Sequence, residues 1–184
     1  MPTADKTKYL FAASIKQLMQ TTPLDEITVT DIVTHSGMSR QTFYRYFQDK
    51  YDLVNWYFER LAQKSFKQMG VSLTLKEGLL KKFTFIEKEK YFFAQAFQSR
   101  DRNSLLHYDY ESILQFYTDI ILKKTGSPLP NDIRFLLEMY CRGSIDMTVK
   151  WATSKTRIPP EQMAGLLVEA LPSRLRDLLS DLQE

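Results

Sequence analysis

The chain has 184 residues, of which 43% are apolar and 13% aromatic, and a formal net charge of +3. This length and composition allow an ordinary hydrophobic core, which excludes a disordered chain. Charged residues interrupt every apolar run before about 18 residues, the length that crosses a membrane, and the first twenty residues hold no apolar signal segment. We therefore expect a cytoplasmic protein with no membrane partner.

Side chains that would support catalysis or metal binding are sparse. The lone cysteine, Cys141, excludes a disulfide within the chain and is expected to be a small buried residue, and His35 and His107 are isolated from it in sequence. The six glycines form no nucleotide-binding or phosphate-binding loop, and motifs of zinc proteases, serine hydrolases and dithiol redox proteins are absent. We expect no enzyme, no catalytic residues, no metal and no cofactor.

One pair of carboxylates falls within a predicted helix. Asp109 and Glu111 flank Tyr110. Residues two apart point to different sides of a helix, so these two acids do not form a catalytic pair. We therefore expect them to lie on a solvated face.

Helical periodicity runs through the whole chain, with proline and glycine between the periodic stretches and no strand-like alternation. The fold class is therefore all-α. The predicted helices run from 3 to 19 or 20, from 29 to 35 or 36, and over 40–47, 50–69, 75–88, 89–98, 105–124, 132–154, 160–171 and 173–182.

Two of the predicted helices are short and joined by a tight turn. Thr28 and Asp31 form a capping pair at the start of the first of them, Gly37 ends it, and Ser39 caps the second. Two short helices around a glycine turn are the physical form of a helix-turn-helix. Residues 1–49 are thus predicted to be a DNA-binding domain.

The second short helix has two distinct faces. Phe43 and Phe47 fall together on the side of the core, because they are four residues apart. Arg40, Gln41 and Thr42 occupy the first turn, the part of a recognition helix that enters the major groove, where Arg and Gln bond to base edges. We predict direct base readout by these three residues.

Further residues are predicted to hold the DNA backbone. Overall charge lends no support, because seven cations and seven anions balance within the first sixty residues. The placement of the charges does support DNA binding, because the stretch from residue 39 to residue 50 holds three cations, Arg40, Arg45 and Lys50, and one anion, Asp49. The candidates for phosphate contact are Thr28, Ser39, Tyr44, Arg45, Tyr46 and Lys50.

The run from Ile27 to Leu53, ITVTDIVTHSGMSRQTFYRYFQDKYDL, resembles the N-terminal signature of the TetR family. The family pattern of an aromatic or Leu, Tyr, Phe and Lys is matched by Phe43, Tyr44, Phe47 and Lys50. The chain departs from the pattern in residues 34–36 before the turn glycine and in residues 45–46, which affects the expected phosphate contacts. Taken singly, exposed side chains such as Arg40, Gln41, Tyr44 and Lys50 would be assigned to a solvated surface, but the combined signature favours DNA contact.

The resemblance implies a homodimer and an effector-binding body in residues 50–184. The helix at 132–154 has apolar residues on two sides, Ile133, Leu136, Leu137, Tyr140, Met147 and Trp151 on one and Phe135, Met139 and Val149 on the other. The last helix repeats Leu175, Leu178, Leu179 and Leu182. By the resemblance, these two helices of each subunit form a four-helix bundle; the alternative is a monomer in which both faces fold back on the chain.

Aromatic residues of the C-terminal body are candidates for an effector pocket, although helix packing explains the same stripe equally well. The candidates are Phe93, Phe97, Phe116, Tyr117, Tyr140 and Trp151. A second, weaker resemblance, in chain length and in the mid-chain helix KYFFAQAF, is to the TetR-like branch of dihydroxyacetone-kinase regulators, which adds a protein to the small molecule as a candidate effector.

The function that follows is an effector-responsive repressor that binds a palindromic operator in double-stranded DNA as a homodimer, with an unknown small-molecule or protein effector. The alternatives are an activator controlled by a protein co-regulator and a helical interaction module whose DNA-binding motif has decayed.

Overall fold

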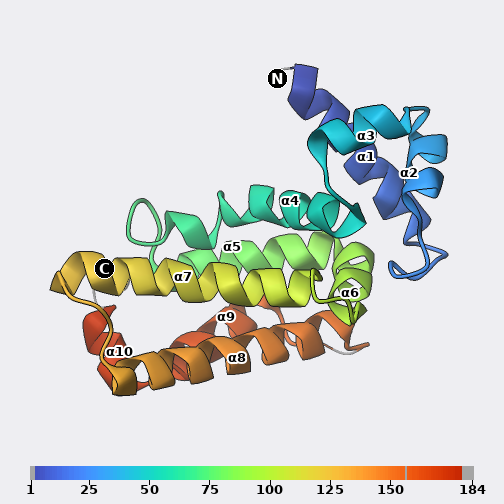
Figure 1. Ribbon diagram of the computed structural model, residues 1–184. Helices are drawn as coiled ribbons and strands as arrows, with labels where there is room; N and C mark the ends of the chain where they lie inside the picture. Colours follow the sequence, from blue (N-terminus) through green and yellow to red (C-terminus); the bar gives the residue numbers. More distant parts are fainter. Residues whose placement is uncertain (1–2, 156, 180–184) are drawn as a thin grey trace. The chain divides into compact units, whose positions relative to one another are not determined.

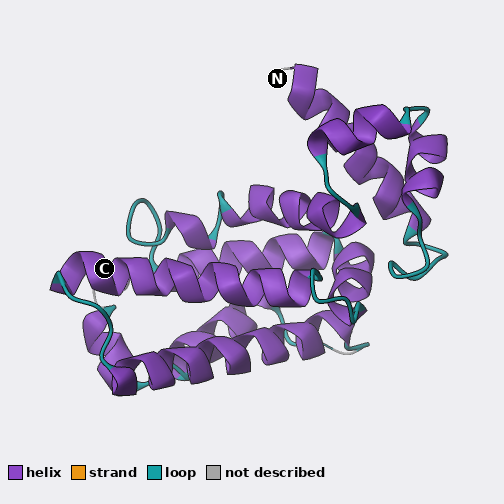
Figure 2. Ribbon diagram, in the orientation of Figure 1, coloured by secondary structure: helices purple, strands orange, loops and turns teal. Residues whose placement is uncertain are grey.

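A computed structural model of the protein describes residues 3–155 and 157–179, and the regular elements in those ranges are helices (Figures 1 and 2). This confirms the all-α fold class. The described elements are α1 (Thr3–Leu18), α2 (Val29–Ser36), α3 (Arg40–Tyr46), α4 (Lys50–Ala62), the 3₁₀-helix η1 (Phe66–Gln68), α5 (Leu75–Lys88), α6 (Lys90–Gln98), α7 (Leu105–Thr125), α8 (Asn131–Thr153), α9 (Pro160–Glu169) and α10 (Ser173–Leu178). Within the described residues, no helix is both long and apolar enough to span a membrane.

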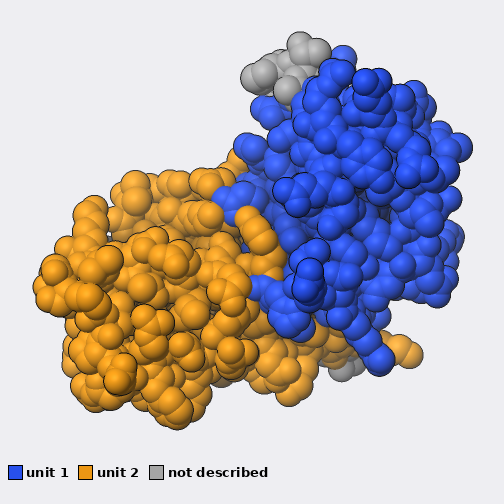
Figure 3. Space-filling model, in the orientation of Figure 1, with its two compact units in different colours: residues 1–60, 91–107 blue, residues 61–90, 108–184 orange. Residues whose placement is uncertain are grey.

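The chain divides into two compact units, residues 1–60 with 91–107 and residues 61–90 with 108–184 (Figure 3). The first unit holds α1, α2, α3, most of α4, and α6. Its core mixes aliphatic and aromatic side chains, and the rings of Phe11 and Phe43 lie 5.2 Å apart in an edge-to-face arrangement. The predicted boundary at residues 49–50 does not coincide with this division and stays a prediction about domains.

The second unit is a bundle of α5, α7, α8, α9 and α10. Its core includes Phe83, Tyr117, Leu137 and Ile145, all buried. Cys141 is buried and free, as the sequence indicated. Burial raises the pKa of its thiol to about 12, so the thiol stays protonated at neutral pH.

The fourth helix was predicted to continue to Met69, and this is wrong. It ends at Ala62 because the chain tightens into i→i+3 hydrogen bonds and the Ser65 hydroxyl donates to the Leu61 carbonyl at 2.8 Å. The departure lets Met69 pack against α5 at Gly78, where a Cβ atom would lie 2.6 Å from the methionine side chain. Glycine in α5 thus makes room for a side chain that precedes the helix.

The last helix is shorter than predicted within the described residues. It ends at Leu178, and the predicted continuation to Leu182 lies outside the described residues. Leu175 and Leu179 are fully buried within their own chain, and α10 packs on α8. Two leucines of the predicted dimer stripe therefore contribute to the core of the subunit.

Candidate DNA-binding surface

The turn between α2 and α3 is built by local hydrogen bonds. The Thr28 hydroxyl accepts from the Asp31 amide at 3.2 Å, while the Asp31 carboxylate accepts from the Thr28 amide at 2.8 Å, which completes the capping box. Gly37 ends α2 with φ of 68°, and the Met38 amide donates to the Val33 carbonyl at 3.0 Å. This left-handed C-cap turns the chain directly into α3.

One face of α3 is anchored in the core of the first unit. Phe43 is fully buried and Phe47, directly after the helix, is nearly so. The Phe11 ring of α1 meets the rings of Phe43 and Phe47 at centroid distances of 5.2 and 6.4 Å. These contacts fix the rotation of α3 about its axis, and therefore which residues face outward.

The other face of α3 is open. Arg40, Gln41, Tyr44 and Arg45 are exposed, and half of the Tyr44 side chain is accessible. The Arg40 guanidinium donates to the Thr30 hydroxyl at 3.4 Å and lies 6.0 Å from the centre of the Tyr44 ring. Both contacts are weak, so the guanidinium can exchange them for a base edge at little cost.

Three of the predicted contact residues already have structural roles. Ser39 accepts from the Thr42 amide at 3.0 Å, and the hydroxyls of the two residues lie 2.9 Å apart. The Thr28 hydroxyl donates to the Asp31 carboxylate at 2.6 Å. These side chains order the helix starts, whose backbone N–H groups favour anions such as phosphate.

Lys50, the first residue of α4, is held by the chain itself. Its ammonium group donates to the carbonyls of Asp25 and Ile27, each at 2.7 Å. An ammonium group has three N–H donors, so one remains after these two bonds. Burial lowers the pKa of Lys50, against the raising effect of Asp25 and other carboxylates nearby.

Asp25 is the centre of a polar cluster that the sequence did not reveal. Its carboxylate accepts from the Ser99 hydroxyl at 2.5 Å, from the Tyr51 hydroxyl at 3.0 Å and from the Arg100 amide at 3.3 Å. The Ser99 bond chiefly lowers the pKa of Asp25, whereas desolvation, with the bond to Asp25 as a further cause, raises the pKa of Tyr51 to about 12. The Asp25 cluster joins the α1–α2 loop, the start of α4 and the end of α6.

Tyr46 faces a lysine that sequence reasoning also missed. The Lys8 ammonium lies 5.8, 5.7 and 5.5 Å from the ring centres of Tyr46, Phe47 and Trp56. Cation–π attraction holds a positive charge beside the end of α3. The sequence around Lys8 gives no indication of this contact, because Lys8 belongs to α1 and the rings come from α3, its C-cap residue and α4.

The six aromatic residues predicted for an effector pocket are divided between the two units. Phe93 and Phe97 are buried in the first unit; Tyr117, Tyr140 and Trp151 are buried and Phe116 half-buried in the second. The cavity lined by Tyr117 and Tyr140 measures about 10 Å³, roughly the space of one water molecule. A ligand among these residues would require the core to open, and the pocket stays a prediction.

The expected solvated face at Asp109 is wrong. Asp109 is fully buried, and the Lys82 ammonium donates to its two carboxylate oxygens at 3.0 and 2.8 Å. The error arose because Lys82 lies 27 residues away on α5, so the sequence around Asp109 shows no counter-charge. Glu111 is exposed, as expected.

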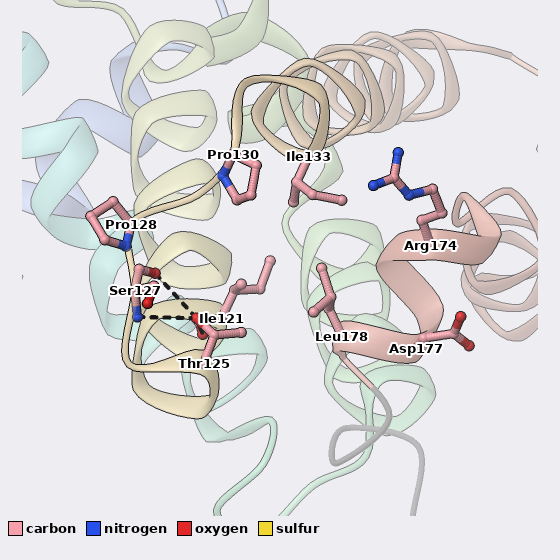
Figure 4. Close-up of a pocket in the computed structure, with 9 residues that line it drawn as sticks. All are labelled: Ile121, Thr125, Ser127, Pro128, Pro130, Ile133, Arg174, Asp177 and Leu178. Atoms are coloured by element: carbon pink, nitrogen blue, oxygen red, sulfur yellow. Dashed lines mark hydrogen bonds between the residues drawn. The ribbon is translucent and has the colours of Figure 1, made fainter.

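A larger cavity, of about 430 Å³, opens where α7 ends and α8 begins, opposite α10 (Figure 4). Ile121, Ile133 and Leu178 point toward one another across it. Arg174, at its edge, is paired with Asp132 at 2.7 Å. None of the predicted effector residues lines this cavity.

Family comparisons bear on both parts of the chain. A sequence model of bacterial regulatory proteins of the tetR family matches residues 13–55, which include α2 and α3. A model of the C-terminal region of TetR-type transcriptional regulators matches residues 74–173, more than half of the chain. The chain belongs to the TetR family. This family consists of DNA-binding transcription regulators and not of enzymes. The family assignment therefore confirms the expectation of a DNA-binding regulator and the expectation that the protein is not an enzyme.

Individual TetR relatives agree with this assignment. The HTH-type dhaKLM operon transcriptional activator DhaS of Lactococcus lactis subsp. lactis is 42% identical over 53 residues, which are 29% of this chain and 28% of the relative. The sequence match thus spans little more than a quarter of that protein. It accords with the weaker resemblance to dihydroxyacetone-kinase regulators.

Solved structures share the fold at low sequence identity. A TetR transcriptional regulator from Streptococcus agalactiae superposes with a TM-score of 0.66 at 22% identity, covering 91% of this chain and 94% of that one. The dihydroxyacetone kinase operon activator DhaS gives 0.61 at 20% identity, covering 97% and 98%. The TetR family repressor AlkX from a Dietzia strain gives 0.53 at 13% identity, covering 94% and 96%.

Proposed function

We propose that the protein is an effector-responsive repressor that binds a palindromic operator as a homodimer. The outward face of α3 carries the proposal. Arg40, Gln41, Tyr44 and Arg45 are exposed on a helix whose opposite face is fixed by Phe43. Side chains on a helix of fixed rotation enter the major groove in a defined register.

The predicted contacts fall into two classes. Arg40 and Gln41, with Thr42, read base edges from the first turn of α3, because Arg and Gln form bidentate bonds with guanine and adenine. Tyr44, Arg45, Tyr46 and the remaining N–H of Lys50 bind phosphates, as do the helix starts at Thr28 and Ser39. The first class determines specificity, and the second determines register and affinity.

The proposed dimer uses the open face of α8. Phe135, Met139 and Met147 are exposed to 66%, 52% and 48%, although a helix in water rarely exposes three large apolar side chains. Met147 was predicted on the other side of this helix, with the core residues. A two-fold pairing of this face in two subunits would place the α3 helices about 34 Å, or a multiple, apart on a two-fold operator.

The test is footprinting and titration of the purified protein on the DNA upstream of its own gene. Arg40→Ala is expected to relax base preference at one position of each half-site, at about 1 to 3 kcal/mol. Lys50→Ala is expected to weaken binding to all sequences alike. Lys123→Ala, which removes an exposed cation from α7, is the matched control and should bind as the parent does.

Salt dependence separates specific binding from a decayed motif. Logarithmic affinity for the operator should fall linearly with the logarithm of salt concentration as phosphate contacts release counterions. Equal affinity for upstream and random duplex at low salt would contradict the proposal and favour an interaction module. Unchanged footprints for both Arg40→Ala and Lys50→Ala would contradict the assigned roles.

A second candidate function is an activator controlled by a protein co-regulator. Two observations favour it: the 42% identical relative is described as an activator, and the cavity among the buried aromatic residues measures only about 10 Å³. Deleting the gene and measuring transcription from the bound promoter distinguishes the two. Transcription rises if the protein represses and falls if it activates.

A further inference from the structure

A groove of about 510 Å³ lies between the chain at the end of α4 and the outer face of α5, within the second unit. Its volume falls in the range of about 300 to 1,000 Å³ that is typical of small-molecule sites. Apolar side chains line it, with Leu61 buried and Leu80 and Phe85 half-buried. The groove therefore offers an apolar surface that the described residues leave uncovered.

The α5 side of the groove is a single stripe of the helix. Lys81, Thr84, Phe85 and Lys88 follow one another at i, i+3, i+4 and i+7, so they share one face. This face is opposite to the one that carries the buried Lys82. A ligand in the groove would thus bind outside the helical core, without displacing any core residue.

Positively charged lysine side chains border the groove on both sides. Lys64 follows α4, while Lys81 and Lys88 belong to α5, and all three are exposed. No described residue forms an ion pair with these three lysines within 4.0 Å, although the pKa of Glu77, one turn earlier on α5, is lowered by its hydrogen bonds with Thr74 and, less strongly, by the charge of Lys81. A cation would be repelled here, while an entirely polar anion would leave the apolar surface unused.

We propose that this groove binds a small amphipathic anion, an alkyl phosphate monoester in its simplest form. Lys81 and Lys88 are seven residues apart, or about 10 Å along the axis, and Thr84 lies midway between them. Their flexible four-carbon stems bring both ammonium groups to a phosphate placed over Thr84, whose hydroxyl is a further donor. The alkyl chain lies on Leu61, Leu80 and Phe85.

Such a ligand is the candidate effector, and only this effector role rests on the proposed function. The groove includes Leu61 from the C-terminal turn of α4, the helix whose first residue, Lys50, bonds to the α1–α2 loop. A ligand bound to both α4 and α5 restrains the C-terminal turn of α4. We expect it to change the affinity of the protein for its operator.

The test is calorimetric titration of the full chain, without DNA, with octyl phosphate below its micellar concentration. Binding is expected, and Lys81→Gln with Lys88→Gln should weaken it about tenfold, the sum of two exposed charge pairs. The matched control is Lys76→Gln with Lys123→Gln, which removes the same charge from exposed positions that do not line the groove and should leave the affinity unchanged. Circular dichroism verifies that both double variants are folded.

Further arms identify the ligand chemistry. Inorganic phosphate and octyl glucoside each carry one half of the probe and should bind much more weakly than octyl phosphate. The absence of octyl phosphate binding, equal affinity in the groove double variant, or equal binding of inorganic phosphate would overturn the proposal. Preferential binding to phosphatidylglycerol vesicles would also overturn it, because it would indicate a membrane surface.

The effector role is tested separately on operator DNA. Saturating octyl phosphate should shift operator affinity of the parent and of the control variant but not of the groove double variant. Binding without such a shift would overturn the effector role. If the parent protein does not recognise the operator in the absence of octyl phosphate, this would instead contradict the proposed function.

Discussion

The buried ion pair of the second unit allows a prediction of stability with a definite sign. The side chains of Lys82 and Asp109 are 5% and 0% exposed, and their closest approach is 2.8 Å. The Lys82 ammonium also lies 5.5 Å from the centre of the Phe66 ring. Replacing Asp109 by Asn removes the charge that compensates a buried ammonium, so we expect a loss of about 3 to 5 kcal/mol in the free energy of unfolding.

Removing both charges should behave differently. In the double variant Lys82→Met, Asp109→Leu no buried charge is left without a partner, and neither group has to be desolvated on folding. Its free energy of unfolding is expected to equal that of the parent or to exceed it by about 1 to 4 kcal/mol. Lys82→Met alone should also lower the free energy of unfolding, because it leaves the Asp109 carboxyl buried without its partner, but by less than Asp109→Asn, since this carboxyl can take up a proton.

Urea denaturation at pH 7, followed by circular dichroism, provides the double-mutant cycle. Coincident transitions by tryptophan fluorescence would establish that unfolding is two-state. Single variants within 1 kcal/mol of the parent would refute the reasoning, since they would mean that the pair is solvated. A double variant as unstable as the sum of the singles would refute the coupling of the two charges.

The same pair sets a pH dependence. Burial raises the pKa of Asp109, and Lys82 opposes that rise. Between the ordinary and the raised value the folded protein binds more protons than the unfolded chain, so the contribution of Asp109 to stability falls as the pH increases through this interval. Asp109→Asn should abolish that part of the pH dependence.

Three further predictions concern the other features. Asp25→Asn should lower the hydrogen-exchange protection of the amides around residues 99–101, whereas the control Glu26→Gln, at a neighbouring exposed acid, should not. Because the pKa of Asp25 is lowered in the folded protein, the contribution of Asp25 to stability is present above about pH 4 and is lost as the pH falls through the lowered value. The Cys141 thiol, whose pKa is about 12 and which is buried, should react with a thiol reagent at pH 8 only after denaturation, and rapid labelling of the native protein would contradict its burial. Phe135→Glu with Met139→Glu should yield monomers in sedimentation equilibrium. Arg134→Glu with Glu138→Arg, on the same helix, leaves the apolar face intact and should remain a dimer. A dimeric double-Glu variant would exclude this face as the interface.

Elements fixed by neighbouring residues were predictable from the sequence. The capping box predicted at Thr28 formed with Asp31, and Thr74 forms the same motif with Glu77 at the start of α5, three residues away in each case. Gly37 ends α2 at the predicted turn, and it does so in the left-handed conformation that glycine adopts most easily. Each of these features depends on hydrogen bonds within one helical turn, so the sequence window that contains the residues also contains the physical cause.

Features that depend on distant partners were not predictable in this way. The Asp25 carboxylate meets Ser99 across 74 residues of sequence, and Asp109 meets Lys82 across 27. A local pattern assigns such carboxylates to solvent, because most aspartates lie there. The end of α4 was missed for the same reason, since Met69 packs into space provided by Gly78 of the next helix.

This difference explains why DNA reading is easier to infer than effector binding. Recognition by α3 requires only that Phe43 faces inward and Arg40 outward, and the helical period determines both. An effector site requires space, which is what remains after every side chain of several helices has been packed. The aromatic residues Tyr117 and Tyr140 had the composition of a pocket but leave about 10 Å³ beside them, whereas the lysine-bordered groove of about 510 Å³ lies on the opposite face of α5. Composition therefore predicts the kind of surface a pocket would need, and only packing determines where that surface is left open.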